Sequence, residues 1–203
     1  NPEAPDGWIM MGMTLNALGR PQEALPYLLR ARDFDSRNPA LLTVLAETYD
    51  NLERPDRALQ LVEEGIETAK AAQPVDPVML AYAYVVKGRL ALRERGDQAV
   101  TLFEEAWRVA QTDSVMPVGY IAQWLWSYYF NVDEIDRIVE VLTFASIRDK
   151  DDPINPYLLG RTYIKTGDKS RALSNLERCR DLDPDQVKCL RWLATMMYRE
   201  NNL

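Results

Sequence analysis

Small side chains recur along this chain at a fixed interval, within stretches whose apolar residues follow helical spacing. Gly12 and Ala46 are 34 positions apart, and so are Ala24 and Ala58. Apolar residues three or four positions away accompany each of them, as expected for the buried stripe of an amphipathic helix. Because two different stripes repeat at the same interval, the sequence predicts stacked pairs of helices, each pair packing on its neighbours.

The clearest unit covers residues 155–184. It contains two apolar stripes with a turn between them, in the order Leu159, Gly160, Tyr163, the turn Gly167-Asp168, Ala172, Leu176 and the stop Asp183-Pro184. Glycine in the turn and proline after the second stripe are common signals at helix ends. We therefore predict two helices joined by a tight turn.

The same unit can be followed through the rest of the chain. The predicted units span approximately residues 5–38, 39–77, 78–116, 117–152 and 153–186, with a terminal helix at 187–201. Turns are expected at Gly19-Arg20-Pro21, Glu53-Arg54-Pro55-Asp56 and Gly96-Asp97. The chain opens at Asn1-Pro2-Glu3 without an initiator Met, so we expect a processed protein or a segment of a longer one.

The fourth unit is unusually aromatic. Residues 114–132 carry no charge and include Trp124 and Trp126. Its small-residue position falls on Trp126 or Ser127, and Ser127 is sterically preferable. A membrane-spanning helix is disfavoured, because polar residues interrupt the run and no basic flank marks it. We expect a helix buried between its neighbours; the alternative is a surface for a partner or ligand.

The order of residues in 155–184 resembles the tetratricopeptide (TPR) repeat, a helix–turn–helix unit. The matching positions are Leu159-Gly160, Tyr163, Ala172, Leu176 and Pro184. The resemblance implies an all-α TPR solenoid of about five repeats plus a terminal helix, wound as one right-handed superhelix over the whole chain. In this family the first helices of successive repeats line a concave groove that holds partners, so the resemblance also implies a scaffold for binding proteins or peptides.

Composition and charge narrow the functional classes. The chain has 31 acidic and 24 basic residues, a net charge of −7 and a pI near 4.8, which disfavours binding to nucleic acid or to anionic membranes. It contains no histidine and no phosphate-binding or nucleophile motif, so we expect no enzyme activity, no cofactor and no metal. Acidic clusters such as Glu63-Glu64 and Asp149 to Asp152 are expected on polar faces and in turns. Nothing in the sequence indicates a cellular location.

The two cysteines, Cys179 and Cys189, lie about symmetrically around the turn at Pro184. They could come close enough to form a bridge. The interpretation we favour is two small buried thiols that take the place of alanine.

The resemblance places a set of side chains in the predicted groove. By position these are Ile9, Met13, Asn16, Thr43, Glu47, Asp50, Val85, Arg89, Leu92, Arg93, Tyr157, Arg161, Ile164, Lys165, Lys188, Arg191 and Thr195. Arg89 with Arg93, and Arg161 with Lys165, are pairs four residues apart that point together. A bound carboxylate would relieve their repulsion, so we predict an extended ligand with acidic residues or a free C-terminus. The alternative is that nearby acidic side chains balance these charges.

The predicted partner-binding residues are therefore Arg89, Arg93, Trp124, Trp126, Tyr157, Arg161, Lys165, Lys188 and Arg191. A second interpretation is an assembly or oligomerisation module of a larger complex, in which the aromatic fourth unit mediates self-association. A third is a chaperone-type or regulatory TPR protein. However, Ile9, Met13 and Val44 stand where the family's chaperone-tail clamp has Lys and Asn, so we do not predict binding of chaperone tails.

Overall fold

The computed structural model describes residues 4–93, 98–113 and 116–200 of the chain. In these residues the fold is all-α, with eleven helices and no strand, which confirms the predicted fold class. The turn expected at Gly96-Asp97 lies outside the described residues. The helices are α1 (Pro5–Ala17), α2 (Pro21–Phe34), α3 (Pro39–Asn51), α4 (Pro55–Ala71), α5 (Pro77–Arg93), α6 (Gln98–Thr112), α7 (Gly119–Asn131), α8 (Ile135–Arg148), α9 (Ile154–Thr166), α10 (Lys169–Leu182) and α11 (Val187–Glu200).

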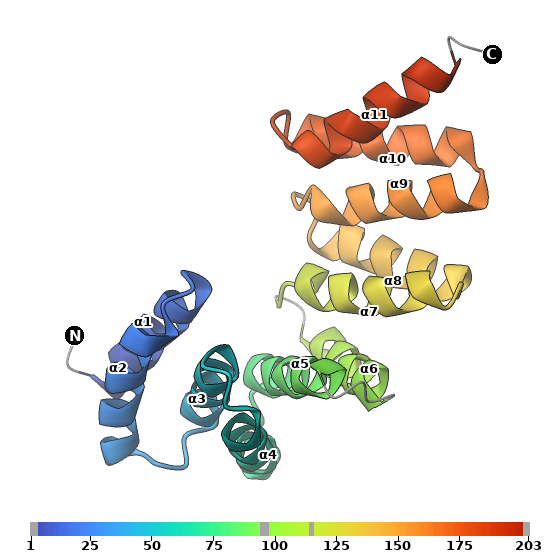
Figure 1. Ribbon diagram of the computed structural model, residues 1–203. Coiled ribbons are helices and arrows are strands. Elements are labelled where there is room, and N and C mark those ends of the chain that lie inside the picture. Colours follow the sequence, from blue (N-terminus) through green and yellow to red (C-terminus); the bar gives the residue numbers. More distant parts are fainter. Residues whose placement is uncertain (1–3, 94–97, 114–115, 201–203) are drawn as a thin grey trace. The chain divides into compact units, whose positions relative to one another are not determined.

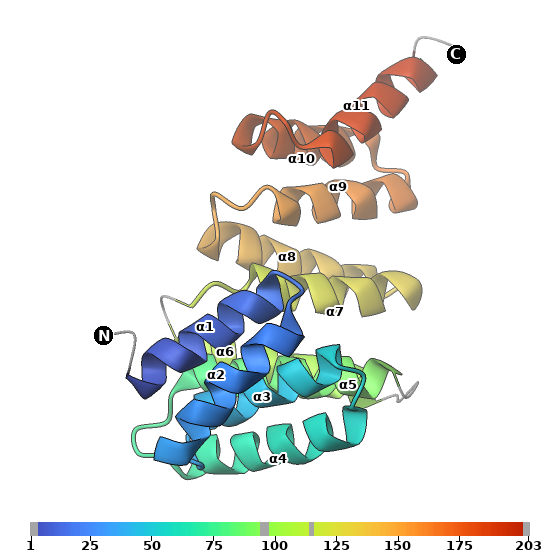
Figure 2. The same ribbon diagram turned by 60° about the vertical axis from the view of Figure 1, so that its left-hand side comes forward.

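The chain divides into two compact units, Asn1–Met116 and Pro117–Leu203, at the predicted boundary between the third and fourth repeats. In the N-terminal unit each helix packs on the next, and the first helices of successive pairs also touch, α1 on α3 and α3 on α5. In the C-terminal unit α7 to α11 stack in sequence order, with α7 also against α9 (Figures 1 and 2). Each unit thus has the helical arrangement of a solenoid. A single array over the whole chain stays a prediction.

The connection after the first helix of a pair has the same backbone geometry in four of the pairs. One residue in each adopts a left-handed conformation, with φ of 70° at Gly19, 59° at Glu53, 61° at Asp133 and 80° at Gly167. Glycine reaches this region without steric cost, whereas a residue with a Cβ atom is strained there. Glu53 and Asp133 therefore show that the turn is imposed by the packing of the helices it joins.

Three pairs of helices are held at close range by a glycine on the first helix. A Cβ atom on Gly88 would lie 2.7 Å from Cε1 of Phe103, and one on Gly160 would lie 2.8 Å from Cγ of Leu176. Gly12 has the same relation to Leu28. The predicted small-residue interval therefore marks positions where the second helix presses a large side chain onto bare backbone.

The aromatic helix α7 is buried on one side only. Ile121, Leu125 and Tyr129 are buried, whereas Tyr120 and Tyr128 are 49% and 37% exposed. Within the C-terminal unit, one face of α7 is therefore packed and the other carries exposed aromatic side chains; burial of α7 between neighbours on both sides stays a prediction. In the described part of the chain, no helix is both long and apolar enough to cross a bilayer.

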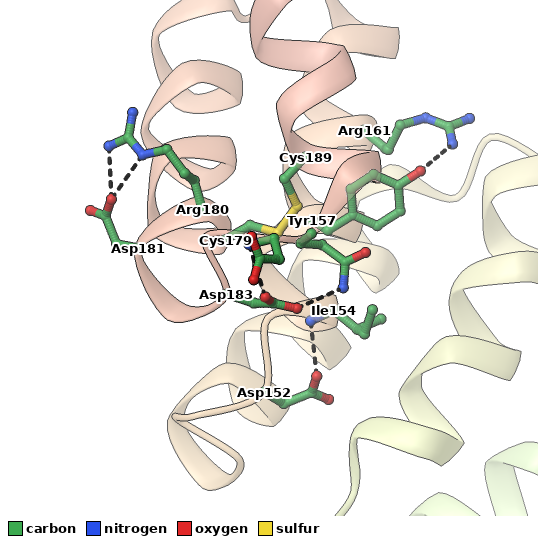
Figure 3. The surroundings of a disulfide bond; sticks show 11 residues. Asp152, Ile154, Tyr157, Arg161, Cys179, Arg180, Asp181, Asp183 and Cys189 are labelled. Atoms are coloured by element: carbon green, nitrogen blue, oxygen red, sulfur yellow. Dashed lines mark hydrogen bonds and ion pairs between the residues drawn. A yellow bond between two sulfur atoms is a disulfide. The ribbon is translucent and has the colours of Figure 1, made fainter.

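The end of α10 and the start of α11 are joined covalently. Cys179 and Cys189 form a disulfide (Figure 3), with Cα atoms 6.3 Å apart, and both residues are fully buried. The turn between the helices is closed by a hydrogen bond of 3.1 Å from the Gln186 amide to the Asp183 carbonyl. The interpretation as two free thiols is wrong, because this turn folds α11 back so that the two buried side chains meet.

We expect Glu53→Gly to raise the free energy of unfolding by about 0.5–1 kcal/mol, because glycine removes the strain of the left-handed turn. The matched control is Glu64→Gly, at an exposed position inside α4, which should lower it by about 1 kcal/mol. Both changes loosen the unfolded chain equally, so the difference between them reports the turn alone. Urea denaturation checks this; equal losses in the two variants would contradict it.

Replacing both cysteines, Cys179→Ala with Cys189→Ala, should lower the free energy of unfolding of the C-terminal unit. The disulfide links residues 10 positions apart, and closing a loop of that size is worth about 2–3 kcal/mol. Denaturation followed by tryptophan fluorescence measures the loss. An unchanged midpoint, or two titratable thiols in the unreduced native protein, would show that the bond does not hold α11.

Candidate functional site

The first-helix face of the N-terminal unit carries a network of charges between α3 and α5. Arg89 donates a hydrogen bond of 2.7 Å to Glu47, and its other terminal nitrogen lies 3.5 Å from Asp50 Oδ2. Arg93 Nη1 lies 2.9 Å from Asp50 Oδ1 and donates to the Asp50 carbonyl at 3.3 Å. The Tyr82 hydroxyl donates to Glu47. Two carboxylates, Glu47 and Asp50, therefore balance the charges of the two arginines within this unit.

Asp50 is the buried centre of this network, with only 1% of its side chain exposed. Burial raises the pKa of Asp50, while Arg93 and Arg89 lower it and Glu47 raises it further. A carboxylate so deeply buried stays ionised only with cations beside it. The sequence left open whether nearby acidic side chains balance the charges of Arg89 and Arg93. In the structure they do. Their role in binding a partner stays a prediction.

In the C-terminal unit, Arg161 on α9 is surrounded by aromatic rings instead of carboxylates. Its guanidinium carbon lies 5.1 Å from the ring centre of Trp192, 5.8 Å from Phe130, 5.9 Å from Trp126 and 6.0 Å from Tyr157. It also donates a hydrogen bond of 3.1 Å to the Tyr157 hydroxyl (Figure 3). Among the described residues no carboxylate lies within ion-pair distance of Arg161. The rings hold the cation from α7, α9 and α11 without neutralising it.

A cavity of about 280 Å³ opens beside this cation, between α7, α9 and the start of α11. Its walls are mainly aromatic and aliphatic, with one cationic side chain, and include Tyr120, Trp124, Trp126, Tyr157, Leu158 and Lys188. The structure therefore brings together four of the predicted site residues, Trp124, Trp126, Tyr157 and Lys188. Trp126 and Tyr157 connect the cavity to Arg161, because each lines the one and contacts the other.

Trp126 occupies the small-residue position of its repeat. It stands between buried Leu125 and buried Tyr129, in the register that Gly160 occupies between Leu159 and Tyr163. Ser127, the other candidate for this position and the sterically preferable one, is exposed, which favours Trp126 of the two alternatives. The indole nitrogen donates a hydrogen bond of 3.1 Å to Thr162 Oγ1 on α9. The ring is thereby fixed against α9 and forms a wall of the cavity.

The remaining predicted residues behave differently from Arg161. Lys165 forms an ion pair with Asp133, donates to the Phe130 carbonyl and lies 4.4 Å from the Phe130 ring centre. Its charge is therefore balanced within the chain. Arg191 is exposed on α11 and lines no cavity described above.

Several residues that the resemblance placed in the groove are instead part of the helix packing. Ile9, Thr43 and Val85 are buried, so the groove assignment is wrong for them. Asn16 is also buried and donates a hydrogen bond of 2.9 Å to Thr48 Oγ1 on α3. Position in the repeat identifies which face of the helix a residue lies on. However, part of that face packs against the first helix of the following pair, so not every residue on it is available to a partner.

Comparison with known proteins identifies the repeat. Two family models, both described as tetratricopeptide repeat, match residues 15–75 and 157–186, one in each unit. The chain belongs to the TPR family. It is accordingly a protein-interaction repeat scaffold, and TPR proteins are generally non-enzymatic.

Solved TPR structures share the fold at low sequence identity. Pseudomonas aeruginosa pilF is 16% identical, with a TM-score of 0.67 over 96% of this chain and 83% of that one. A thermophilic TPR protein of Thermus thermophilus is 24% identical, with a TM-score of 0.64 over 96% and 100%. YrrB, described as a TPR protein with an unusual peptide-binding site, is 16% identical, with a TM-score of 0.58 over 94% and 92%. None of the curated proteins matches the sequence.

Three residues of the site in this TPR unit were not singled out from the sequence as binding residues. Trp192 lies one helical turn after Lys188, and that spacing could have placed it beside the groove. Phe130 was visible only as part of an aromatic run. Thr162, which holds the Trp126 indole, gave no signal, because threonine inside a helix usually bonds its own backbone.

The acidic cluster between α8 and α9 has a structural role. Asp149 Oδ2 accepts hydrogen bonds of 2.8 Å from the Val118 amide and 2.5 Å from the Gly119 amide, at the start of α7. Asp152 Oδ1 accepts one of 2.9 Å from the Ile154 amide at the start of α9. These carboxylates cap helix N-termini. Within the described ranges, no group of three acidic or cysteine side chains could hold a metal ion.

We expect Arg89→Met to lower the free energy of unfolding of the N-terminal unit by about 3 kcal/mol near neutral pH, because it leaves Asp50 buried with one cation fewer. The control is Arg171→Met, which breaks an exposed pair with Asp168 and should change stability little. Chemical denaturation of both variants and of the parent chain measures the difference.

The loss in Arg89→Met should shrink as the pH falls. Asp50 has a folded-state pKa raised above its unfolded value, so its contribution to stability is present below the unfolded pKa and is lost as the pH rises through the folded one. Without Arg89 the folded pKa rises further, and protonation removes the buried charge. The same loss at every pH from about 4 to 7 would show that Arg89 contributes packing rather than charge.

Proposed function

We propose that the C-terminal unit binds an extended segment of a partner protein through the first-helix face formed by α7, α9 and α11. The ligand carboxylate, from an acidic side chain or a free C-terminus, contacts Arg161. The observation that carries this proposal is that Arg161 is held by four aromatic rings and pairs with no carboxylate of the described chain. Arg89, Arg93 and Lys165, by contrast, each form an ion pair with a carboxylate of this chain.

The environment of Arg161 favours a carboxylate ligand physically. Rings on several sides displace water from the guanidinium, and an ion pair is stronger where the dielectric constant is low. The hydrogen bond to Tyr157 fixes the side chain before the ligand arrives, which reduces the entropy that binding must overcome. Lys188, at the edge of the same cavity, adds a second positive charge. The net charge of the whole chain is negative, so this positive site is a local feature.

A second candidate is an assembly role for the aromatic helix. Tyr120 and Tyr128 are exposed on α7, and exposed aromatic side chains are frequent in protein interfaces. This role requires a second copy or another domain to cover α7. It makes no use of the charge on Arg161, and this difference separates the two proposals.

Arg161→Gln should weaken binding of carboxylate-bearing peptides by about ten- to a hundredfold, the value of a hydrogen bond to a charged group. The ligands are a defined set of extended peptides with and without acidic residues, with free or amidated C-termini, titrated by calorimetry. The control Arg171→Gln removes an arginine of the same unit that lies 4.6 Å from the Tyr163 ring centre but is paired with Asp168. Its affinities should equal those of the parent chain.

Equal affinities for acidic and neutral peptides, or for the Arg161→Gln variant and the parent chain, would overturn the carboxylate proposal. If light scattering then showed a mass that rises with concentration, the assembly role would be favoured instead.

A further inference from the structure

The last helix of the C-terminal unit, α11, carries an exposed apolar face. One side of α11 packs on α10 (Figure 1). Another side holds Ala194, with Leu190 one turn before it and Met197 one turn after it. Ala194 is exposed, and Leu190 and Met197 are 40% and 49% exposed. A solenoid end that stays in water normally has a polar outer face, so an apolar one indicates a binding surface.

In α9 the equivalent face is covered by the second helix of the pair. Ala194 stands at the small-residue position, 34 residues after Gly160. The residues of α9 that correspond to its two apolar neighbours are Pro156 and Tyr163. All three residues of α9 are buried, and α10 presses Leu176 onto Gly160. In the described structure, α11 therefore has the face of a first helix without a second helix to cover it.

The described pairs show what kind of helix fits such a face. A second helix with a Gly or Ala opposite it carries Ala, followed three or four positions later by a large apolar residue that is fully buried. These sets are Ala24 with Leu28, Ala58 with Val62, Ala99 with Phe103 in its three-residue turn plus one, and Ala172 with Leu176. A helix that covers Ala194 needs the same pattern, because the small residue leaves room for one large side chain and no more.

The charges on α11 indicate that this helix is acidic. Residues 187–198 contain two cationic side chains, Lys188 and Arg191, and no acidic one. Arg191 is exposed and lies about 60° around the helix from Ala194, at the edge of the apolar face. Thr43 has the equivalent position in α3, and a Cβ atom on Gly65 of α4 would lie 3.2 Å from its Oγ1. An acidic residue at that point of the covering helix would therefore meet Arg191.

A second copy of the chain fits this face less well than a partner protein does. In the copy's own second helices, the large residues such as Phe103 and Leu176 are already buried within their pairs. Two α11 helices packed face to face would bring Lys188 and Arg191 of both copies into one interface. Like charges across an interface are unfavourable. The face and its charges therefore favour a helix of opposite charge from another protein.

We propose that α11 docks an acidic amphipathic helix of a partner protein, which lies on Ala194 as α10 lies on Gly160. That helix carries Ala, a large apolar residue one turn later and an acidic residue in the following turn that pairs with Arg191. The surface is separate from the one around Arg161. Trp192, which contacts Arg161, lies about 160° around α11 from Ala194. The inference goes beyond the proposed function and does not depend on it.

The test uses the whole chain and blocked peptides with the sequence of α4, a second helix with more acidic than basic residues. Three peptides carry Gly65→Glu, Gly65→Gln or Gly65→Lys, which have similar helix propensities, so that differences in affinity report charge. Calorimetric titration should show the Glu peptide binding about two- to fivefold more tightly than the Gln peptide, and the Lys peptide binding most weakly. Adding Val62→Thr to the Glu peptide should weaken its binding at least about fivefold, because it buries a hydroxyl group.

Variants of the chain test the surface directly. Ala194→Gln places a larger side chain in the contact and should weaken binding of the Glu peptide at least about tenfold. Arg191→Gln should abolish the preference for Glu over Gln and leave the effect of Val62→Thr unchanged. Ser174→Gln, at an exposed position of α10, is the control and should leave every affinity unchanged. Circular dichroism confirms that each variant folds.

The outcomes separate this inference from the proposed function. If no peptide binds, or if Ala194→Gln leaves the affinities unchanged, the docking surface is overturned. Equal affinities of the Glu, Gln and Lys peptides would overturn the acidic partner. If Arg161→Gln removes binding and Ala194→Gln does not, the peptides occupy the carboxylate site, so the inference fails while the proposed function stands. A mass that rises with concentration in light scattering, and no longer rises in Ala194→Gln, would identify a second copy as the occupant instead.

Discussion

The packing of a large second-helix side chain onto bare backbone of the first helix is the contact on which the rest of this structure depends. Phe103 on Gly88 and Leu176 on Gly160 bring the two helices of a pair closer than any side chain at the glycine would allow. This approach fixes which face of each helix points inward. It thereby determines which residues are left on the first-helix face, where the charged network of α3 and α5 and the aromatic surroundings of Arg161 lie.

The fourth repeat lacks this contact, and its packing differs accordingly. Trp126 cannot nest as glycine does, and its ring lies instead across α9, hydrogen-bonded to Thr162. The neighbouring helices do not close the space beside it, so a cavity with aromatic walls remains. A protein normally loses stability by leaving such a space. That a bulky residue stands at this position is consistent with a functional role, since departures from a consistent pattern are expected where binding is required.

The helical-repeat fold could be predicted from the sequence because the residues that specify it lie close together along the chain. The recurrence from Gly12 to Ala46 and the turn at Gly167 depend only on residues within one or two repeats. Which arginines form ion pairs within the chain could not be predicted in this way. Arg89 and Arg161 have similar neighbours in sequence, yet one meets Asp50 and the other meets Trp192. Which partner each meets depends on the register between helices some 30 to 40 residues apart, which the repeat pattern leaves free. The disulfide between Cys179 and Cys189 could not be predicted for the same reason, because it forms only if α11 folds back at the right angle.

The disulfide also decides how the C-terminal unit responds to mechanical load. Tension applied to α11 beyond Cys189 passes through the sulfur atoms into α10, so the hairpin between Cys179 and Cys189 cannot be pulled straight. At the first turn of α11 force passes into α10 through a covalent bond, whereas the turns after Cys189 are held by non-covalent contacts. A partner that pulls on the C-terminal end of α11 would therefore unwind the turns after Cys189 first, and would then load α10 directly through the bond.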